Sequence, residues 1–448
     1  MRIILTLVCI ISLNFSIFAQ NELSLKEAVT IALHKNTQLL KTSNELQGYE
    51  SDVKASYGNF LPDLNASGSF GWTRTEVQAR TISYGGFVLQ QPATTSETRS
   101  YSANLNSGIT IFDGLSNIAQ LNQSKNNLEA ARLNLERVKQ DIVFQTISLY
   151  YQVINAQQQL KVKEEDVKYN QKNLETITER NKLGGATLAD VYLQQVQAGN
   201  ADLALIQAKN SLETAKSNLL YYLGLNVFQE YTYSDTLTSS ESQLLKSNID
   251  YNYADLANIA EQALNSRVDY KSAKLSLESA YNGVTIAQSG HLPVLSGNGS
   301  FGLGSNKINE LWNSKTYSLG LNLSIPIFSG FSVSNRVQLA EVNAEDHQYD
   351  LSDLERQIKK DIQKTYLDLQ AAEKALGVSK NNVKSAQENL KIEQEKYSLG
   401  SGKLLDVLVA NTNYTTAQSD YINSEFSYIV LSQQLKYYLG TLEYKQYE

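Results

Sequence analysis

The sequence predicts an α+β protein made of two tandem copies of one unit, in which two β-strands precede a pair of long helices. Three observations support this fold class. Segments of the first half recur in the second half at a constant separation, four stretches alternate apolar and polar residues, and no proline occurs between Pro92 and Pro293. Because proline disrupts a helix interior, its absence allows helices much longer than those of ordinary globular domains.

The internal repeat sets the order of the elements. IFDGL at 111–115 recurs as IFSGF at 327–331, 216 positions later, and two further pairs of motifs keep this separation. Upstream, LPDL at 61–64 and LPVL at 292–295 lie 231 positions apart. Since the two separations differ by 15 residues, the first copy is expected to carry the longer loop.

The same elements are expected in both copies. The first copy, residues 20–224, consists of an initial helix, strands at 64–73 and 101–112 joined by a loop at 73–100, and helices at 115–182 and 187–222. The second copy, residues 254–440, consists of an initial helix, strands at 294–304 and 316–328, and helices at 331–397 and 403–438. Polar segments at 225–253 and 441–448 lie outside the repeat.

The longer helix of each copy should measure about 100 Å at 1.5 Å per residue. In the first copy, apolar residues recur every seventh position at Leu121, Leu128, Leu135, Ile142 and Leu149. This spacing predicts left-handed supercoiling around a neighbouring helix. An ordinary coiled coil would explain the helices but would leave the strands without a role.

The N-terminus predicts export. Its first twenty residues, MRIILTLVCIISLNFSIFAQ, contain a basic Arg2, an apolar stretch at 3–18 and a small residue, Ala19, at a suitable cleavage point. Residues 1–19 are therefore expected to be a signal peptide. The single cysteine, Cys9, lies inside it, so the mature chain should use neither disulfides nor thiol chemistry.

The composition argues against several function classes. The 46 acidic residues exceed the 39 basic ones, which disfavours nucleic-acid binding. The three histidines, His34, His291 and His347, are far apart, so no metal site is expected. No phosphate-binding loop, nucleophile elbow or convincing carboxylate pair is present. The sequence therefore predicts neither an enzyme nor a bound cofactor.

The strand at 316–328 shows the alternation most clearly. One side carries Tyr317, Leu319, Leu321, Leu323, Ile325 and Ile327, and the other carries Ser318, Gly320, Asn322 and Ser324. Such a strand has one apolar and one polar face. A soluble β-sandwich gives the same alternation, so the pattern by itself allows either a soluble sheet or a membrane sheet.

Three further observations favour a membrane sheet. The strands have about the 9–12 residues that a tilted strand needs to cross a bilayer. Their polar face is uniformly small and hydrophilic, as a water-filled lumen requires, and the chain is exported. Aromatic residues lie near the loop ends, where an interfacial girdle would form, at Phe70, Trp72, Tyr101 and Tyr317.

A sheet of four strands cannot close into a membrane barrel, because the smallest such barrels have eight strands. Unpaired strand edges in lipid cost several kcal/mol for each backbone group. The chain is therefore expected to oligomerise. Four strands per subunit permit a dimer, a trimer or a tetramer, with barrels of about 8, 12 or 16 strands.

The two copies, the strand–helix junctions ITIFDGL and SIPIFSGF, and the segments NKLGGATLADVYLQ at 181–194 and YSLGSGKLLDVLVA at 397–410 resemble the TolC-type outer-membrane channel family. The resemblance covers essentially the whole mature chain. It implies a homotrimer in the outer membrane of a Gram-negative bacterium, with a 12-stranded β-barrel in lipid and a long α-helical barrel in the periplasm. The segments 225–253 and 441–448 would form its equatorial belt.

The resemblance also implies a function. Such a trimer is the passive exit duct of a tripartite efflux pump or a type I secretion system. Its partners are a periplasmic adaptor, also called a membrane fusion protein, and an inner-membrane transporter. The specificity for cargo normally belongs to the transporter, so no particular cargo is predicted. The alternative function is that of a structural or adhesive periplasmic coiled coil without channel activity.

The two helix tips are the expected adaptor-binding sites. Their glycines suit the left-handed conformation at a helix C-terminus and so predict tight helical hairpins. The tip residues are Leu183, Gly184 and Gly185 in the first copy and Leu399, Gly400, Ser401 and Gly402 in the second.

Asp190 and Asp406 occupy matching positions just after the tips. Thr187 and Asp190 form a T-x-x-D pattern typical of a capping box, which is the structural interpretation of Asp190. The resemblance places both aspartates at the periplasmic mouth, where a ring of carboxylates would favour cations and raise some carboxylate pKa values. Tyr397 also matches the family pattern of a gate.

Two positions depart from that pattern. Val409 stands where well-known members have a second aspartate, and Gly402 stands where they have an arginine. These departures predict a simpler constriction with one acidic level instead of a gate locked by a full set of charged links.

Overall fold

The computed structural model describes residues 21–234 and 256–447, which form two compact units. Thr42–Glu136 and Arg267–Gln357 make up one unit, called here the sheet unit. The rest of the described chain makes up the helical unit. The predicted signal peptide at 1–19 and residues 235–253 of the predicted equatorial segment lie outside the described residues.

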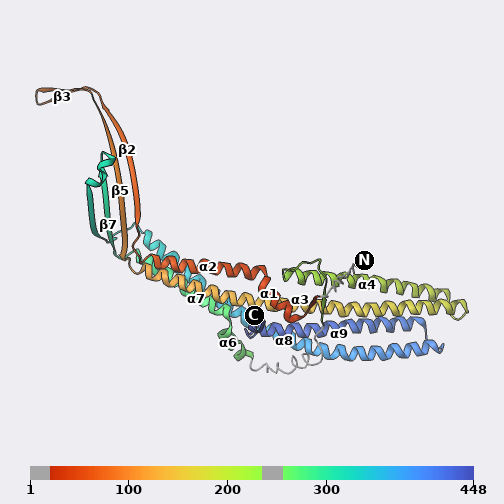
Figure 1. The fold of residues 1–448 in the computed structure, drawn as a ribbon. Helices are drawn as coiled ribbons and strands as arrows, with labels where there is room; N and C mark the ends of the chain where they lie inside the picture. The colour runs from red at the N-terminus through yellow and green to blue at the C-terminus, as the bar shows by residue number, and fades with distance from the viewer. Residues whose placement is uncertain (1–20, 235–255, 448) are drawn as a thin grey trace, which may run out of the picture. The chain divides into compact units, whose positions relative to one another are not determined.

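The sheet unit is built on one antiparallel four-stranded sheet with the order β2-β5-β7-β8 (Figure 1). Its strands are β2 Asn65–Val77, β5 Thr94–Phe112, β7 Val294–Ser305 and β8 Lys315–Ser324. β5 pairs with β7, so strands from the two halves of the sequence meet in the middle of the sheet. β2 and β8 are its edges, and no strand of the described ranges pairs with the outer side of either.

The apolar face of this sheet is exposed. Across β7 and β8, Phe301 opposes Tyr317, with ring centroids 5.0 Å apart. Further along β8, Leu319 and Leu321 are 93% and 74% exposed. In a soluble protein, a second layer of structure normally covers the apolar face of a sheet. No such layer covers this face within the described chain.

The loop predicted at 73–100 is corrected by the structure. β2 continues to Val77 and β5 begins at Thr94, so the two strands pair well beyond their expected ends. The segment between them forms a separate hairpin of β3 Arg80–Tyr84 and β4 Phe87–Gln91. The extra pairing follows from threonine-rich ends with a high β-propensity and from a tight turn at Gly85 and Gly86, both with positive φ.

Each strand–helix junction contains two consecutive residues in the left-handed region. Gly114 and Leu115 have φ values of 68° and 73°, and Gly330 and Phe331 have φ values of 60° and 63°. A side chain on Gly114 would lie 2.7 Å from the Leu292 Cβ atom, so only glycine fits there. This pair of residues immediately precedes each long helix. In the second copy β8 ends at Ser324, so the strand predicted at 316–328 stops short of its expected end, and residues 325–329 connect it to the pair.

The long helices begin and end within one residue of their predicted bounds. α3 Ser116–Lys182 and α8 Ser332–Ser398 have 67 residues each, and both contribute to both units. α4 Leu188–Tyr222 and α9 Leu404–Tyr438 have 35 residues each. No helix within the described ranges is long and apolar enough to cross a membrane.

The shorter elements complete the two units. In the helical unit, a parallel pair of β1 Asn21–Leu23 and β6 Tyr231–Tyr233 lies beside the buried Tyr150, whose Oη atom is 3.0 Å from the Leu23 carbonyl oxygen. The remaining elements are α1 Leu25–Lys35, α2 Thr37–Gly58, α6 Leu256–Ser266, α7 Val268–Ser289, and the 3₁₀ turns η2 Ile308–Asn313 and η3 Lys445–Tyr447.

Candidate functional site at the helix tips

The two helix tips have the same backbone geometry. Gly184 and Gly400 both have a φ of 76°. In the first tip, the Gly185 amide donates to the Arg180 carbonyl over 2.7 Å, and in the second tip the Ser401 amide donates to the Lys396 carbonyl over 2.9 Å. These bonds satisfy the last carbonyls of α3 and α8 and reverse the chain within a few residues.

The predicted adaptor-binding residues lie together on these turns. Leu183 is 86% exposed and Leu399 is 83% exposed, although both are large and apolar. The turn residues after them are Gly184 and Gly185 in the first tip and Gly400, Ser401 and Gly402 in the second. Each tip therefore presents one exposed leucine on a hydrogen-bonded turn.

Asp190 forms the capping box that its sequence pattern predicts. Its Oδ2 atom accepts hydrogen bonds from the Thr187 amide over 3.0 Å and from the Thr187 hydroxyl over 2.7 Å. In return, the Asp190 amide donates to Thr187 Oγ1 over 3.1 Å. These bonds hold the carboxylate against the first turn of α4.

Asp406 has the matching position in α9 but a different environment. Lys403 is the N-cap residue and makes no side-chain cap. Asp406 is exposed, and among the described residues no hydrogen bond or ion pair engages its carboxylate or joins it to Asp190. The two aspartates are therefore not equivalent, since one is committed to capping and the other is free.

Tyr397 contributes to packing between the two helical hairpins. The Arg180 guanidinium carbon lies 4.9 Å from the centre of the Tyr397 ring, a cation–π contact between α3 and α8. The same ring packs beside a buried cluster of Ile177, Leu404 and Leu408. Tyr397 thus joins the ends of three helices.

A buried polar cluster above the tips was not predicted from the sequence. Asp166 Oδ1 accepts from Asn170 Nδ2 over 3.0 Å, from Asn411 Nδ2 over 2.9 Å and from Thr415 Oγ1 over 3.3 Å. Gln194 Nε2 donates to the Asn170 carbonyl over 2.9 Å. The cluster borders a cavity of about 290 Å³ and links α3, α4 and α9.

The polar side chains of this cluster are buried to an unusual degree. Gln194 is completely buried and Asn170 is 4% exposed. Such polar residues at inward positions of long helices set the register of packed helices at a cost in stability. A search for Asn and Gln on the inward face of the predicted helices would have found them.

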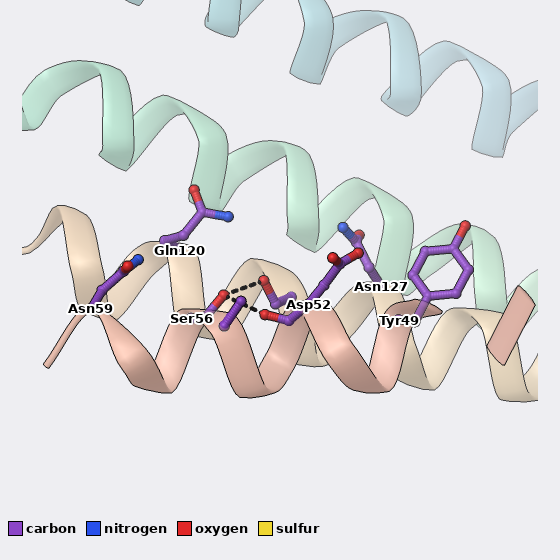
Figure 2. A pocket seen from close by; sticks show the side chains of 8 residues that line it. Tyr49, Asp52, Ser56, Asn59, Gln120 and Asn127 are labelled. Atoms are coloured by element: carbon purple, nitrogen blue, oxygen red, sulfur yellow. Dashed lines mark hydrogen bonds between the residues drawn. The ribbon is translucent and has the colours of Figure 1, made fainter. Parts of the chain in front are cut away.

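A second polar cavity, of about 380 Å³, lies in the sheet unit. Figure 2 shows its lining, with Tyr49, Asp52 and Asn59 from α2 and Gln120 and Asn127 from α3. At its centre the Ser56 and Ser124 hydroxyl oxygens lie 2.8 Å apart. The small side chains of these serines allow α2 and α3 to approach closely. We therefore interpret this cavity as a result of helix packing and not as a binding site.

The profile of the outer membrane efflux protein family matches residues 28–225 and 259–441. The chain belongs to this family. The match covers both copies of the predicted repeat, including the tips and the sheet. Membership confirms the predicted outer-membrane location and the predicted role in efflux.

Relatives of this efflux protein cover almost all of it. The chain is 23% identical over 439 residues to the outer membrane protein TolC of Vibrio cholerae, covering 96% of this chain and 93% of the relative. It is 22% identical over 446 residues to TolC of Escherichia coli K12, covering 96% and 84%. Both relatives are outer membrane proteins by name, which agrees with the location of the family and gives no support to the alternative of a structural coiled coil.

Solved structures show the same fold. The efflux protein aligns with CusC at a TM-score of 0.82 and 17% identity, covering 93% of this chain and 91% of CusC. It aligns with the CmeC outer membrane channel of Campylobacter jejuni at a TM-score of 0.81 and 18% identity, covering 94% and 88%. The α+β architecture of the chain is thus that of known outer-membrane channels.

Proposed function

We propose that three copies of this efflux protein form a continuous passive duct, with a β-barrel in the outer membrane and a helical barrel in the periplasm. The observation that carries this proposal is the open four-stranded sheet, with its exposed apolar face and two unpaired edges. Three such sheets supply twelve strands. Closure would pair β8 of one copy with β2 of the next and leave no backbone group unpaired in lipid.

The helix tips would bind a periplasmic adaptor. Leu183 and Leu399 are exposed apolar side chains on rigid turns, and six such leucines in a trimer would present a regular ring. Exposed apolar groups arranged in this way favour docking of a partner with apolar pockets. The adaptor would in turn connect the duct to an inner-membrane transporter.

Asp406 would supply the acidic level of a periplasmic constriction. Its carboxylate is exposed and unpaired within the described chain, whereas Asp190 is engaged by Thr187. A ring of three Asp406 carboxylates would attract cations and repel anions. Val409, in the next turn, is 52% exposed and adds no charge, which is consistent with a single acidic level.

Tyr397 would hold the constriction closed at rest. It keeps the second hairpin against α3 through Arg180 and the buried cluster. Opening would require these contacts at the tips to separate, while the buried polar cluster around Asp166 keeps the hairpins joined further up.

The proposal is tested with purified protein in planar lipid bilayers. Wild-type protein should run as a heat-modifiable trimer and give a small, cation-selective conductance. The Asp190→Ala/Asp406→Ala variant should give a larger and less selective conductance. Absence of any channel in both proteins, or a water-soluble monomer extracted without detergent, would rule the proposal out.

A further inference from the structure

The β3–β4 hairpin has one strongly apolar face that no described residues cover. The paired residues Ile82 and Leu89, and the paired residues Tyr84 and Phe87, lie on the same face because cross-strand partners share a side of the ribbon. These four side chains are between 41% and 88% exposed. Ser83, paired with Val88, lies on the opposite face.

An isolated two-stranded hairpin is marginally stable in water, and a contiguous exposed apolar patch marks an interaction surface. The hairpin therefore needs a partner for its apolar face. The candidates are the lipid around the barrel and the same hairpin of a neighbouring copy.

The strands below the hairpin argue against lipid. Beyond the aromatic pair Phe70 and Tyr101, whose ring centroids are 5.0 Å apart, the β2–β5 ribbon carries a band of exposed charges. Arg74 lies 3.6 Å from Glu97 in this band. The band comprises Arg74, Glu76, Glu97 and Arg99. Charges of both signs belong in the headgroup region or in water, so they separate the hairpin from the hydrocarbon.

The position of the hairpin fits a second copy of the chain. The hairpin lies between the edge strand β2 and its neighbour β5 in the sequence, at the end of the ribbon that these two strands form. In a closed trimer every copy therefore carries it at the same height above the barrel. Figure 1 shows that the hairpin turns sideways from the end of the β2–β5 ribbon. Such a turn suits an arm that lies across the barrel mouth.

The length of the hairpin is sufficient. A strand of five residues spans about 17 Å. A barrel of twelve strands, spaced about 4.8 Å apart and tilted by about 40°, has a radius of about 12 Å. Three arms of this length can therefore meet at the barrel axis.

We propose that the three β3–β4 hairpins pack their apolar faces against one another over the outer mouth of the duct and form an extracellular lid. This inference rests on the proposed trimer. The lid buries four apolar side chains from each copy that otherwise remain in water. It would restrict entry of large polar molecules from outside, independently of the constriction at the helix tips.

Single cysteines test the contact between the hairpins. Cys9 is the only natural cysteine, so Tyr84→Cys is made in a Cys9→Ala background, with Ser83→Cys as the matched control on the opposite face. The purified trimers are oxidised and run on non-reducing gels. We expect several-fold more cross-linked dimer from Tyr84→Cys than from Ser83→Cys.

Equal or absent cross-linking in intact trimers would overturn the lid and leave the proposed duct standing. A monomeric protein would overturn both. A nitroxide label at Tyr84→Cys distinguishes contact with lipid from contact with a neighbouring hairpin. Strong dipolar broadening of its spectrum indicates that labelled hairpins lie next to one another. High accessibility to oxygen without such broadening would show that the face lies in lipid and would also overturn the lid.

A functional readout follows from the same contact. The variant Tyr84→Ser/Phe87→Ser keeps the Gly85–Gly86 turn but removes the apolar tip. Because the constriction at the helix tips would block passage by itself, both this variant and the control Ser83→Ala are made in the Tyr397→Ala background, in which that constriction should be open. We expect the lid variant to take up more of a large polar antibiotic into intact cells than the control, and equal uptake with an intact trimer and an open constriction would contradict a lid.

Discussion

Asn411 Nδ2 donates a hydrogen bond of 2.9 Å to Asp166 Oδ1, and this bond joins α9 to α3 across 245 positions of the sequence. The same oxygen also accepts from Thr415 on α9 and from Asn170 on α3. One carboxylate oxygen therefore holds the second hairpin in register with the first. Because each donor is mostly buried, the loss of the acceptor leaves polar groups without partners.

Replacing Asp166 with alanine should destabilise the protein by about 1–3 kcal/mol, because the donors of Asn411 and Thr415 lose their acceptor, whereas Asn170 Nδ2 still donates to the carbonyl of residue 166. Asp166→Asn should cost less, since its amide oxygen can still accept. Thermal unfolding of the detergent-solubilised protein measures both effects. Asp353→Ala is the control, because that side chain is 72% exposed, and equal midpoints for Asp166→Ala and Asp353→Ala would contradict this role.

Thr187→Ala should weaken the start of α4 by about 1 kcal/mol, since it removes the N-cap hydroxyl that accepts from the Asp190 amide. Hydrogen exchange of the first amides of α4 should become faster, while exchange at the start of α9 stays unchanged. Unaltered protection at α4 would show that the capping box contributes little.

The corresponding change in α9 should have the opposite sign. Lys403 makes no side-chain cap, and Asp406 stands three residues later, so Lys403→Thr creates the capping pattern of α4. The variant should slow hydrogen exchange at the start of α9. It should also draw the Asp406 carboxylate into the cap and reduce the cation selectivity of the channel, a result that Lys403→Ala should not give.

Asp406→Asn should reduce cation selectivity more than Asp190→Asn, because of these two carboxylates only that of Asp406 has no partner among the described residues. The reversal potential in a bilayer with a salt gradient measures this difference. A larger effect of Asp190→Asn would mean that the free carboxylate is not the one facing the conducted ions.

Tyr397→Ala should increase the resting conductance, since it removes the ring that packs beside Arg180 and the cluster of Ile177, Leu404 and Leu408. Tyr397→Phe keeps the ring and should conduct as the wild type does. The conductance of single trimers at rest, without any opening stimulus, distinguishes the two. A resting conductance of Tyr397→Ala equal to that of the wild type would show that this tyrosine does not hold the channel closed.

Alkaline pH should destabilise the helical unit through Tyr222. Burial, with a smaller contribution from the Asp141 charge, raises the pKa of Tyr222 from 10.0 to about 12. The folded state therefore keeps the proton after the unfolded state has lost it, so stability is unaffected below about pH 10 and falls as the pH rises from 10 to 12. Tyr222→Phe should flatten the alkaline part of the unfolding curve, whereas Tyr221→Phe, at an 80% exposed neighbour, should not.

The long helices were predictable because their signals are local. The turns that end the long helices need a residue in the left-handed conformation, and the glycines at 184 and 400 allow it. Between the junctions and these turns, no proline interrupts the helices. The capping box at Thr187 is likewise contained within four residues. These features depend on the chain's own neighbours, so the printed sequence is enough.

The extent of β2 and β5 was not predictable in the same way. The ends at Val77 and Thr94 are polar, and a polar alternating segment becomes a strand only when a partner supplies its hydrogen bonds. The hairpin of β3 and β4 was also missed, although its apolar residues and its glycine pair are strand and turn signals. Pairing between strands, rather than hydrophobicity, decided this region.

The sequence by itself determined the family, the order of the elements, the lengths of the long helices and the tight turns at their tips, because these follow from periodicity, turn chemistry and a constant repeat separation. Only the tertiary structure decided that the Asp406 carboxylate has no partner among the described residues, and that Asp166 receives donors from α9. The reason is that a hydrogen bond depends on distances of about 3 Å between side chains, and the packing of helices far apart in sequence sets those distances.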